Sequence, residues 1–131
     1  MIVLDASVLI AHLDGDDRHH AAALALLTDL VDQDLGVNPL TLAEVLVAPV
    51  RHDRLDPVLG LLRGLEIEEL PLPSDAAVGL ARLRVETGLK MPDCCVLLSA
   101  EATGSSVASF DRRLLQAAGR QGLSTVGPQD E

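Results

Sequence analysis

Short apolar runs alternate with segments of helical periodicity along the whole chain. The apolar runs predict strands at Ile2–Leu4, Leu35–Val37, 65–72, 107–108 and 124–126. The intervening segments predict helices at 7–13, 19–31, 41–47, 55–65, 75–87, 92–103 and 111–118. Strands separated by helices imply an α/β fold with a parallel sheet and helices on both faces, in which ligands bind beyond the C-terminal ends of the strands.

Individual residues refine the ends of these helices. Pro49 predicts the end of the helix at 41–47, because proline lacks the backbone N–H that a helix interior needs. Ser74 predicts the N-cap of the helix at 75–87, and Gly88 predicts its C-terminal end. Gly119 predicts the end of the last helix.

The composition favours one domain over residues 1–131 with an aliphatic core. Apolar residues make up 48% of the chain, yet the sequence has one Phe and no Tyr or Trp. No apolar run approaches the roughly 20 residues that a membrane-spanning helix needs. Because the chain starts directly on a predicted strand, we expect no signal peptide and a cytoplasmic location.

The spacing of the cysteines and histidines does not favour a metal site made of these residues. Cys94 and Cys95 are adjacent in a predicted helix, where neighbouring side chains diverge, so we expect two buried thiols and no disulfide. His19 and His20 are also adjacent and have no third ligand nearby, so we expect surface or helix-start roles for them.

Four acidic residues lie at or near the starts of predicted helices that follow strands or turns. Asp5 directly follows the strand Ile2–Leu4, and Asp111 lies just beyond the strand at 107–108. Glu44 lies one turn into the helix after the second strand, and Asp93 opens the helix that begins at Pro92. Carboxylates at these positions can converge over one edge of the sheet.

Each acid also has a purely structural interpretation. Asp5 and Asp111 can act as helix N-caps, and Asp93 can favour the dipole of the helix that it opens. Glu44 can complete a capping box with Thr41, three residues earlier. Taken one at a time, these alternatives stay open.

Taken together, the acids favour a metal site. Four unpaired carboxylates in one cleft repel one another, and a divalent cation removes this repulsion. Mg²⁺ prefers carboxylate oxygens and water as ligands, and nucleases use such ions to activate a water and stabilise the leaving oxygen. We therefore predict that Asp5 is there to hold a metal.

The chain resembles the PIN-domain ribonucleases, and within them the VapC toxins of bacterial toxin–antitoxin pairs. The resemblance covers nearly the whole chain and rests on the opening IVLDASVLI, the segment TLAEV and the block PDCCVLLSAEATGSSVASFDRRLL. It implies a three-layer α/β/α sandwich around a short parallel sheet.

The resemblance also implies the site residues. The metal-binding acids of the family correspond to Asp5, Glu44, Asp93 and Asp111. Ser7 corresponds to a small hydroxyl residue after the first acid, and Ser109 stands where the family often has Thr; both would orient carboxylates or waters. Arg112 and Arg113 follow the last acid and would contact RNA phosphates, although we expect at least one of them to be an ordinary solvated helix residue.

The implied activity is Mg²⁺-dependent cleavage of RNA, with Mn²⁺ as a possible substitute. The implied partners are a VapB-like antitoxin, which blocks the cleft, and operator DNA, which the toxin binds only together with the antitoxin; a homodimer is expected. The net charge of −10 argues against a broad basic surface. With one Phe, base stacking is expected to contribute little, so the prediction is selective cutting of a structured RNA.

Three other interpretations compete with a PIN nuclease. A receiver-like phospho-acceptor domain would need a paired acid after the first strand, where this chain has Ala6. A haloacid-dehalogenase-type phosphatase would need a second Asp where Ser7 stands. A catalytically degenerate PIN-like module that only binds RNA or protein is the third alternative, and it ranks lower because all four acids are present.

Overall fold

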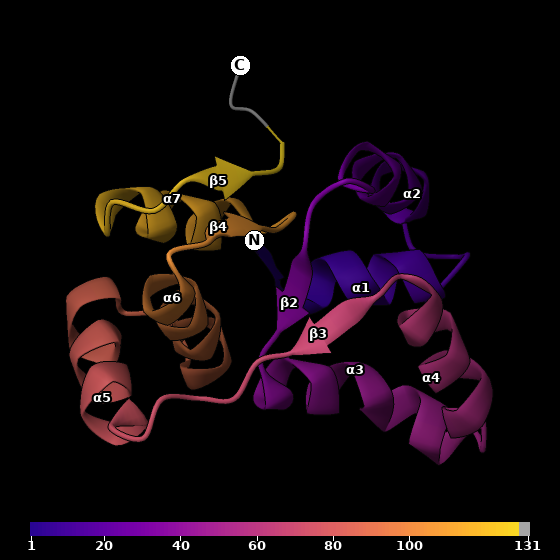
Figure 1. Ribbon diagram of the computed structural model, residues 1–131, viewed down its shortest axis with the longest axis horizontal. Coiled ribbons are helices and arrows are strands. Elements are labelled where there is room, and N and C mark those ends of the chain that lie inside the picture. The colour runs from indigo at the N-terminus through magenta and orange to yellow at the C-terminus, as the bar shows by residue number, and fades with distance from the viewer. Residues whose placement is uncertain (129–131) are drawn as a thin grey trace.

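A computed structural model describes residues 1–128, which form a five-stranded parallel sheet flanked by helices (Figure 1). The strands are β1 (Ile2–Leu4), β2 (Leu35–Val37), β3 (Ile67–Glu69), β4 (Ser106–Ala108) and β5 (Thr125–Val126). The helices are α1 (Ala6–Leu13), α2 (His20–Asp29), α3 (Pro39–Arg51), α4 (Leu55–Gly64), α5 (Ala76–Thr87), α6 (Met91–Thr103) and α7 (Arg112–Arg120). The parallel α/β architecture predicted from the alternation is confirmed.

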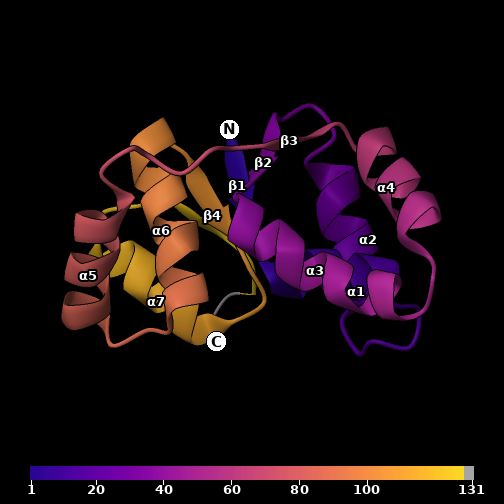
Figure 2. The same ribbon diagram turned by 90° about the horizontal axis from the view of Figure 1, so that it is seen from below.

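Helices cover both faces of the sheet and make three layers, as the view in Figure 2 shows. Along β1, Ile2 and Leu4 point into a core shared with α1, α2, α3 and α4. Val3, between them, points into a second core shared with α5, α6 and α7. Side chains alternate across a strand, so a fully apolar strand can fill two cores.

The strand order is β3-β2-β1-β4-β5, which places β1 at the centre. From β1 the chain steps outward through β2 and β3 on one side, and later through β4 and β5 on the other. Leu4 pairs with Ala108, so β1 and β4 end level with each other. The strand order therefore reverses between these two strands, and the crevice beyond such a reversal is where open α/β sheets bind ligands.

Three predicted helix ends are wrong. Helix α3 continues through Pro49 to Arg51, because buried Val45 anchors its middle and the N–H of His52 closes its last turn onto the Ala48 carbonyl at 3.0 Å. Helix α7 continues through Gly119, and the left-handed glycine is Gly122, at φ +80°. Ser74 is not a cap: α5 begins after Asp75, which makes no side-chain cap hydrogen bond.

The segment at 65–72 is a much shorter strand than predicted. Leu65 ends α4 in helical conformation, and Glu66 takes a left-handed conformation with φ +55°. Pro71 lacks the N–H that a longer strand would need, which leaves β3 as Ile67–Glu69. Leu70 is nevertheless buried at 6% exposure, as its place in the apolar pattern predicts.

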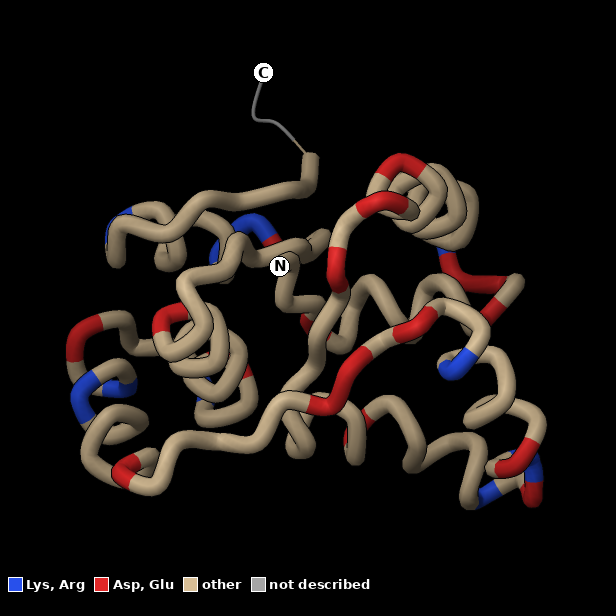
Figure 3. Tube along the Cα trace, viewed as in Figure 1, with Lys and Arg blue, Asp and Glu red and all other residues tan. Residues whose placement is uncertain are grey.

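Acidic residues lie along β3, one of the two edge strands. Glu66, Glu68 and Glu69 are exposed there, and Figure 3 shows this acidic edge in red. Charged side chains on an edge strand discourage pairing with other chains. Within residues 1–128 no helix is both long and apolar enough to cross a membrane.

Candidate active site

Asp5 occupies the C-terminal end of the central strand and is 5% exposed. Its side chain caps α1 by accepting a hydrogen bond from the N–H of Val8 at 3.3 Å. Its backbone N–H donates to the Ala108 carbonyl at 3.2 Å, which ties the residue to the end of β4. Burial is the main cause of a pKa raised above the ordinary value of an aspartate, so the cap alone does not compensate for the buried charge.

Two serine hydroxyls hold the Asp5 carboxylate from both sides. Ser7 donates to Oδ1 at 2.7 Å, and Ser109 donates to Oδ2 at 2.5 Å. Ser109 is fully buried, and its hydroxyl also accepts the N–H of Asp111 at 2.9 Å. These bonds connect Asp5 at the end of β1 with Asp111 beyond the end of β4, so both acids are held at the strand reversal.

Asp111 is the N-cap of α7. Its Oδ1 accepts hydrogen bonds from the N–H groups of Arg113 at 2.9 Å and Leu114 at 3.4 Å. The cap predicted as a structural alternative is therefore real, but it uses one carboxylate oxygen only. The charge of Asp111 contributes to the raised pKa values of both Asp5 and Asp93. The same side chain is therefore also part of an acidic group that consists of Asp5, Glu44, Asp93 and Asp111.

Asp93 shows most directly that the acids gather. It lies in the first turn of α6 and is half-buried. Its pKa is raised, first by burial and then by the charges of Asp111, Asp5 and Glu44, in that order; Lys90 lowers it. Acids that are far apart in the sequence therefore act on one carboxylate.

Glu44 reaches this group from the second turn of α3. The capping box with Thr41 is wrong, because the N-cap of α3 is Asn38, whose Oδ1 accepts the N–H of Thr41 at 2.9 Å. Helix α3 packs against α6, which carries Asp93. Glu44 is exposed, and its charge raises the pKa of both Asp93 and Cys95. With no capping role, the carboxylate of Glu44 is available to the acidic group.

The donor set fits a hard divalent cation. Four carboxylates and two hydroxyls are the oxygen donors that Mg²⁺ and Mn²⁺ prefer, and burial together with neighbouring carboxylates raises the pKa values of Asp5 and Asp93. Among residues 1–128, no three acidic, histidine or cysteine side chains already stand at metal-binding distances.

The two predicted RNA contacts, Arg112 and Arg113, have different surroundings. Arg113 donates to the Gly88 carbonyl at 3.4 Å, beside the end of α5. Arg112 lines an open groove next to the acids. The other side chains of this groove include Ser7, Arg18, His19, Phe110 and Asp111. Arg112 is thus the better placed of the pair to meet a substrate.

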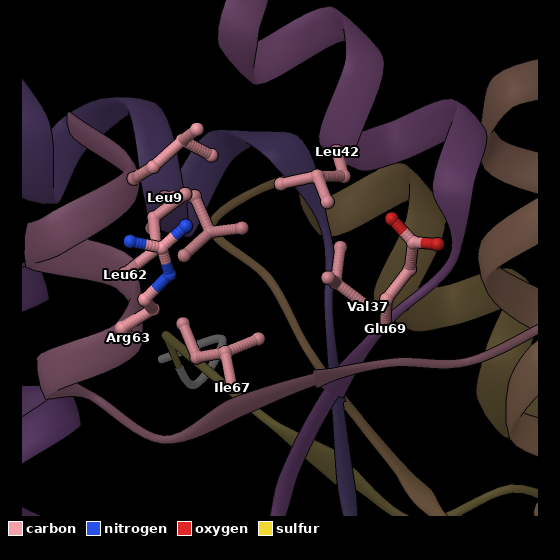
Figure 4. A pocket seen from close by; sticks show the side chains of 8 residues that line it. Leu9, Val37, Leu42, Leu62, Arg63, Ile67 and Glu69 are labelled. Carbon is pink, nitrogen blue, oxygen red and sulfur yellow. The ribbon is translucent and has the colours of Figure 1, made fainter. Parts of the chain in front are cut away.

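A second hollow lies away from the acids, between α1, α3, α4 and β3 (Figure 4). Its wall is apolar apart from Arg63 and Glu69, which come from α4 and β3 (Figure 4). The apolar side chains are Leu9, Val37, Leu42, Leu59, Leu62 and Ile67. This hollow contains none of the four acids and has no polar cluster that could perform hydrolysis.

Several residues near the acids had no predicted role in the site. Asn38 is fully buried after β2 and caps the helix that carries Glu44; the pair Asn38-Pro39, a cap followed by proline at the first helical position, was the available signal. Lys90 acts on Asp93 from the N-cap of α6. Contact between His19 and Phe110 had no signal in the sequence, because only the fold brings them together.

The chain matches the PIN domain family model over residues 2–120. A toxin–antitoxin complex from Klebsiella pneumoniae aligns with a TM-score of 0.76 and 21% identity over all of both chains. VapBC2 from Rickettsia felis, bound to promoter DNA, aligns with a TM-score of 0.73 and 13% sequence identity, over 97% of this chain and 98% of its own. VapC20 from Mycobacterium tuberculosis, a sarcin–ricin loop cleaving toxin, aligns with a TM-score of 0.73 and 14% sequence identity, over 89% of this chain and 95% of its own.

No curated protein matches the sequence. Because the sequence identities are low, these structural alignments establish a shared fold and nothing more.

Proposed function

Since the chain belongs to the PIN domain family, we propose that it is a metal-dependent endoribonuclease and the toxin of a VapBC-type toxin–antitoxin pair. One observation carries the proposal. Three acids from three other parts of the fold each raise the pKa of Asp93, beside the crevice where the strand order reverses. Capping explains Asp5 and Asp111 individually, and the helix dipole favours Asp93, but none of these local roles explains why acids from four parts of the chain lie close enough together to raise the pKa of Asp93.

In this proposal Asp5 and Asp93 are the principal ligands of one Mg²⁺, which Mn²⁺ can replace. Glu44 and Asp111 complete the site, directly or through water. When bound, the ion supplies the Lewis acidity that activates a water and the positive charge that stabilises the leaving oxygen. Cleavage would then hydrolyse a phosphodiester bond within the RNA.

The surrounding residues position the acids and the substrate. Ser7 and Ser109 fix the orientation of the Asp5 carboxylate through their hydrogen bonds to its two oxygens. Arg112, in the adjacent groove, contacts an RNA phosphate. Arg113 supports this segment of α7 through its hydrogen bond to Gly88.

We propose a structured cellular RNA as the substrate. Net charge of −10 gives little general attraction for RNA, so recognition must rely on shape and on a few local contacts. The fold neighbour VapC20 is a toxin that cleaves the sarcin–ricin loop, and this supports an RNA target. Cleavage in the cytoplasm follows from such a target.

A VapB-like antitoxin is the proposed partner, and operator DNA is bound by the pair together. Fold neighbours that are toxin–antitoxin complexes, some with DNA, support this. Large apolar side chains are exposed on α3 and α4: Val47 at 51%, Val50 at 60% and Leu61 at 57%. Covering them would lower the free energy of a complex. A homodimer is also proposed, and the mass in solution by light scattering tests it.

The test is cleavage of total RNA in Mg²⁺ by the wild type and by Asp5→Asn, Asp93→Asn and the control Asp32→Asn. Asp32 is an exposed acid in the turn before β2, at the N-terminal edge of the parallel sheet, opposite the C-terminal strand ends where Asp5 and Asp111 lie. Both site variants should lose at least about 100-fold in rate, on the scale of removing a metal-assisted step, and should relieve growth arrest. Asp32→Asn should cut like the wild type. A wild-type rate in either site variant would show that the substituted acid is not a metal ligand, whereas no cleavage by the wild type would favour a module that only binds.

A further inference from the structure

We propose that the stacked rings of His19 and Phe110 form a base-binding platform that takes an unpaired base beside the scissile phosphate. This inference rests on the proposed nuclease function and names its specificity determinant. The two rings lie 5.0 Å apart between centroids, with 17° between their planes. They line the open groove that also holds Ser7 and Asp111, so a base on the platform lies next to the acidic group.

The chain itself fixes Phe110 relative to the acids. Phe110 lies between Ser109, which holds Asp5, and Asp111. Its backbone N–H donates to the Ser7 hydroxyl at 3.1 Å, and that hydroxyl donates to Asp5 at 2.7 Å. Phe110 is the only Phe, Tyr or Trp residue in the sequence, and the Ser7 hydroxyl alone links its backbone to Asp5. An aromatic ring held in this way stacks on a base at little cost in conformational entropy.

His19 is placed by the loop before α2. Its N–H donates to the Asp17 side chain at 2.8 Å, and Arg18 donates from Nε to His19 Nε2 at 3.2 Å. Arg18 is exposed and lines the same groove, as does Arg112. The groove therefore combines a π surface with two guanidinium-bearing residues. Proteins that bind unpaired nucleotides use this combination, with stacking for the base and cations for the phosphates.

The platform changes what the composition predicted. One Phe in 131 residues predicted little base stacking. The fold places that Phe beside the acids and stacks an imidazole against it, so a single unpaired base can continue the stack where cleavage occurs. The expected substrate is therefore an RNA whose cut site lies in a loop or bulge, where a base is free to stack.

A purely structural role for the stack is the competing explanation. His19 could serve only to hold the 14–19 loop against the end of β4, and its loss would then weaken binding of every RNA alike. Removing single bases from the RNA distinguishes the structural role from the base-binding role. A platform makes cleavage depend on one particular base, and this dependence disappears when the platform is removed.

The experiment uses a hairpin RNA that carries the wild-type cut site, found by sequencing the ends of digested total RNA. A series of hairpins has one abasic nucleotide at each position near the cut. The proteins are the wild type, His19→Ala, His19→Phe and Phe110→Ala, with His52→Ala as control. His52 is an exposed histidine after α3 and does not line the groove. kcat and KM are measured for each pair, and thermal melting checks each fold.

In the wild type, one abasic position should lower kcat/KM roughly 10–100-fold, the range for loss of one stacked base. His19→Ala and Phe110→Ala should lose a comparable factor on the intact hairpin and become insensitive to that abasic position. His19→Phe, which keeps a ring, should restore most of the wild-type rate and sensitivity, and His52→Ala should match the wild type. If Phe110→Ala does not fold, the two His19 variants carry the test.

Equal abasic sensitivity in the wild type and in His19→Ala would overturn the platform while the nuclease function stands. A wild type that cuts but responds to no abasic position would also overturn it. A wild type that cuts no RNA in Mg²⁺ would refute the proposed function, and the platform with it.

Discussion

Asp93 carries an electrostatic cost that nothing in its own helix explains. An acid in the first turn of a helix is usually stabilised by the helix dipole. Here burial and three neighbouring carboxylates outweigh that benefit and the favourable charge of Lys90, so the pKa is raised. A residue that weakens the fold in order to stand where it does is typical of a binding or catalytic site.

This cost predicts how stability varies with pH in metal-free buffer. Because the pKa of Asp93 is raised in the folded state, the folded chain holds the proton more strongly than the unfolded chain does. The free energy of unfolding therefore falls as pH rises from 3.8, the ordinary pKa of an aspartate, through the raised pKa of Asp93, and the cost is complete above that raised pKa. Asp93→Asn removes the charge and should be more stable at pH 7.5 by roughly 0.5–1 kcal/mol.

Urea unfolding in EDTA between pH 4 and pH 8 measures this. The advantage of Asp93→Asn over the wild type should shrink toward the acidic end of the range. Asp32→Asn, an exposed acid, serves as the control and should stay within about 0.5 kcal/mol of the wild type throughout. Equal or lower stability of Asp93→Asn at pH 7.5 would show that the acids do not repel one another in the folded chain.

At the scale of elements, the caps of α1, α3 and α7 support the site. Each is a polar residue directly after, or close to, the end of a strand: Asp5 after β1, Asn38 after β2 and Asp111 beyond β4. The same strand–cap–helix arrangement therefore fixes the helix and aims polar groups at the crevice. Asn38 differs from the other two because it carries no charge and is fully buried.

Asn38→Ala should destabilise the fold by about 1–2 kcal/mol, because the Thr41 N–H loses its acceptor and the Thr41 hydroxyl loses its donor. The matched control is Asp75→Ala. Asp75 is the N-cap of α5 but makes no side-chain cap hydrogen bond, so the change should stay within about 0.5 kcal/mol. Urea unfolding compares the two. If they cost the same, the cap at Asn38 has no special role.

The elements also show how far local signals carry. Strands β1, β2 and β4 and the edge strand β5 lie where the apolar pattern predicted them, and Gly88 ends α5 in a left-handed conformation as predicted. Pro49 and Gly119 did not end their helices, because packing of Val45 and the hydrogen bonds of the last turns outweigh weak local preferences. Local signals therefore locate the elements more reliably than their ends.

At the scale of the whole molecule, the four acids come from four separate places in the chain. Asp5 and Asp111 lie at the ends of neighbouring strands, while α3 and α6 bring Glu44 and Asp93 from the two helical layers. A cation held by these acids would link both layers to the sheet. Binding would therefore stabilise the whole fold as well as the site.

Mg²⁺ should raise the melting temperature of the wild type by several degrees. A ligand that binds only the folded state adds about 2.7 kcal/mol at a concentration 100 times its Kd. Asp5→Asn and Asp93→Asn should show less than about a third of the wild-type rise, since each loses a principal ligand. NaCl at equal ionic strength controls for screening. Equal rises in the wild type and both variants would place the bound Mg²⁺ elsewhere.

The sequence by itself determined the fold class and the candidate acids. Periodicity and capping act between residues a few positions apart, so Asp5 and Asp111 could be located at strand ends from the chain alone. Only the tertiary structure decided which side chains come close: that the charge of Glu44 acts on Asp93, that Arg113 donates to Gly88, and that His19 stacks on Phe110. The reason is physical, because strand order and helix packing set distances in space that spacing along the chain does not contain.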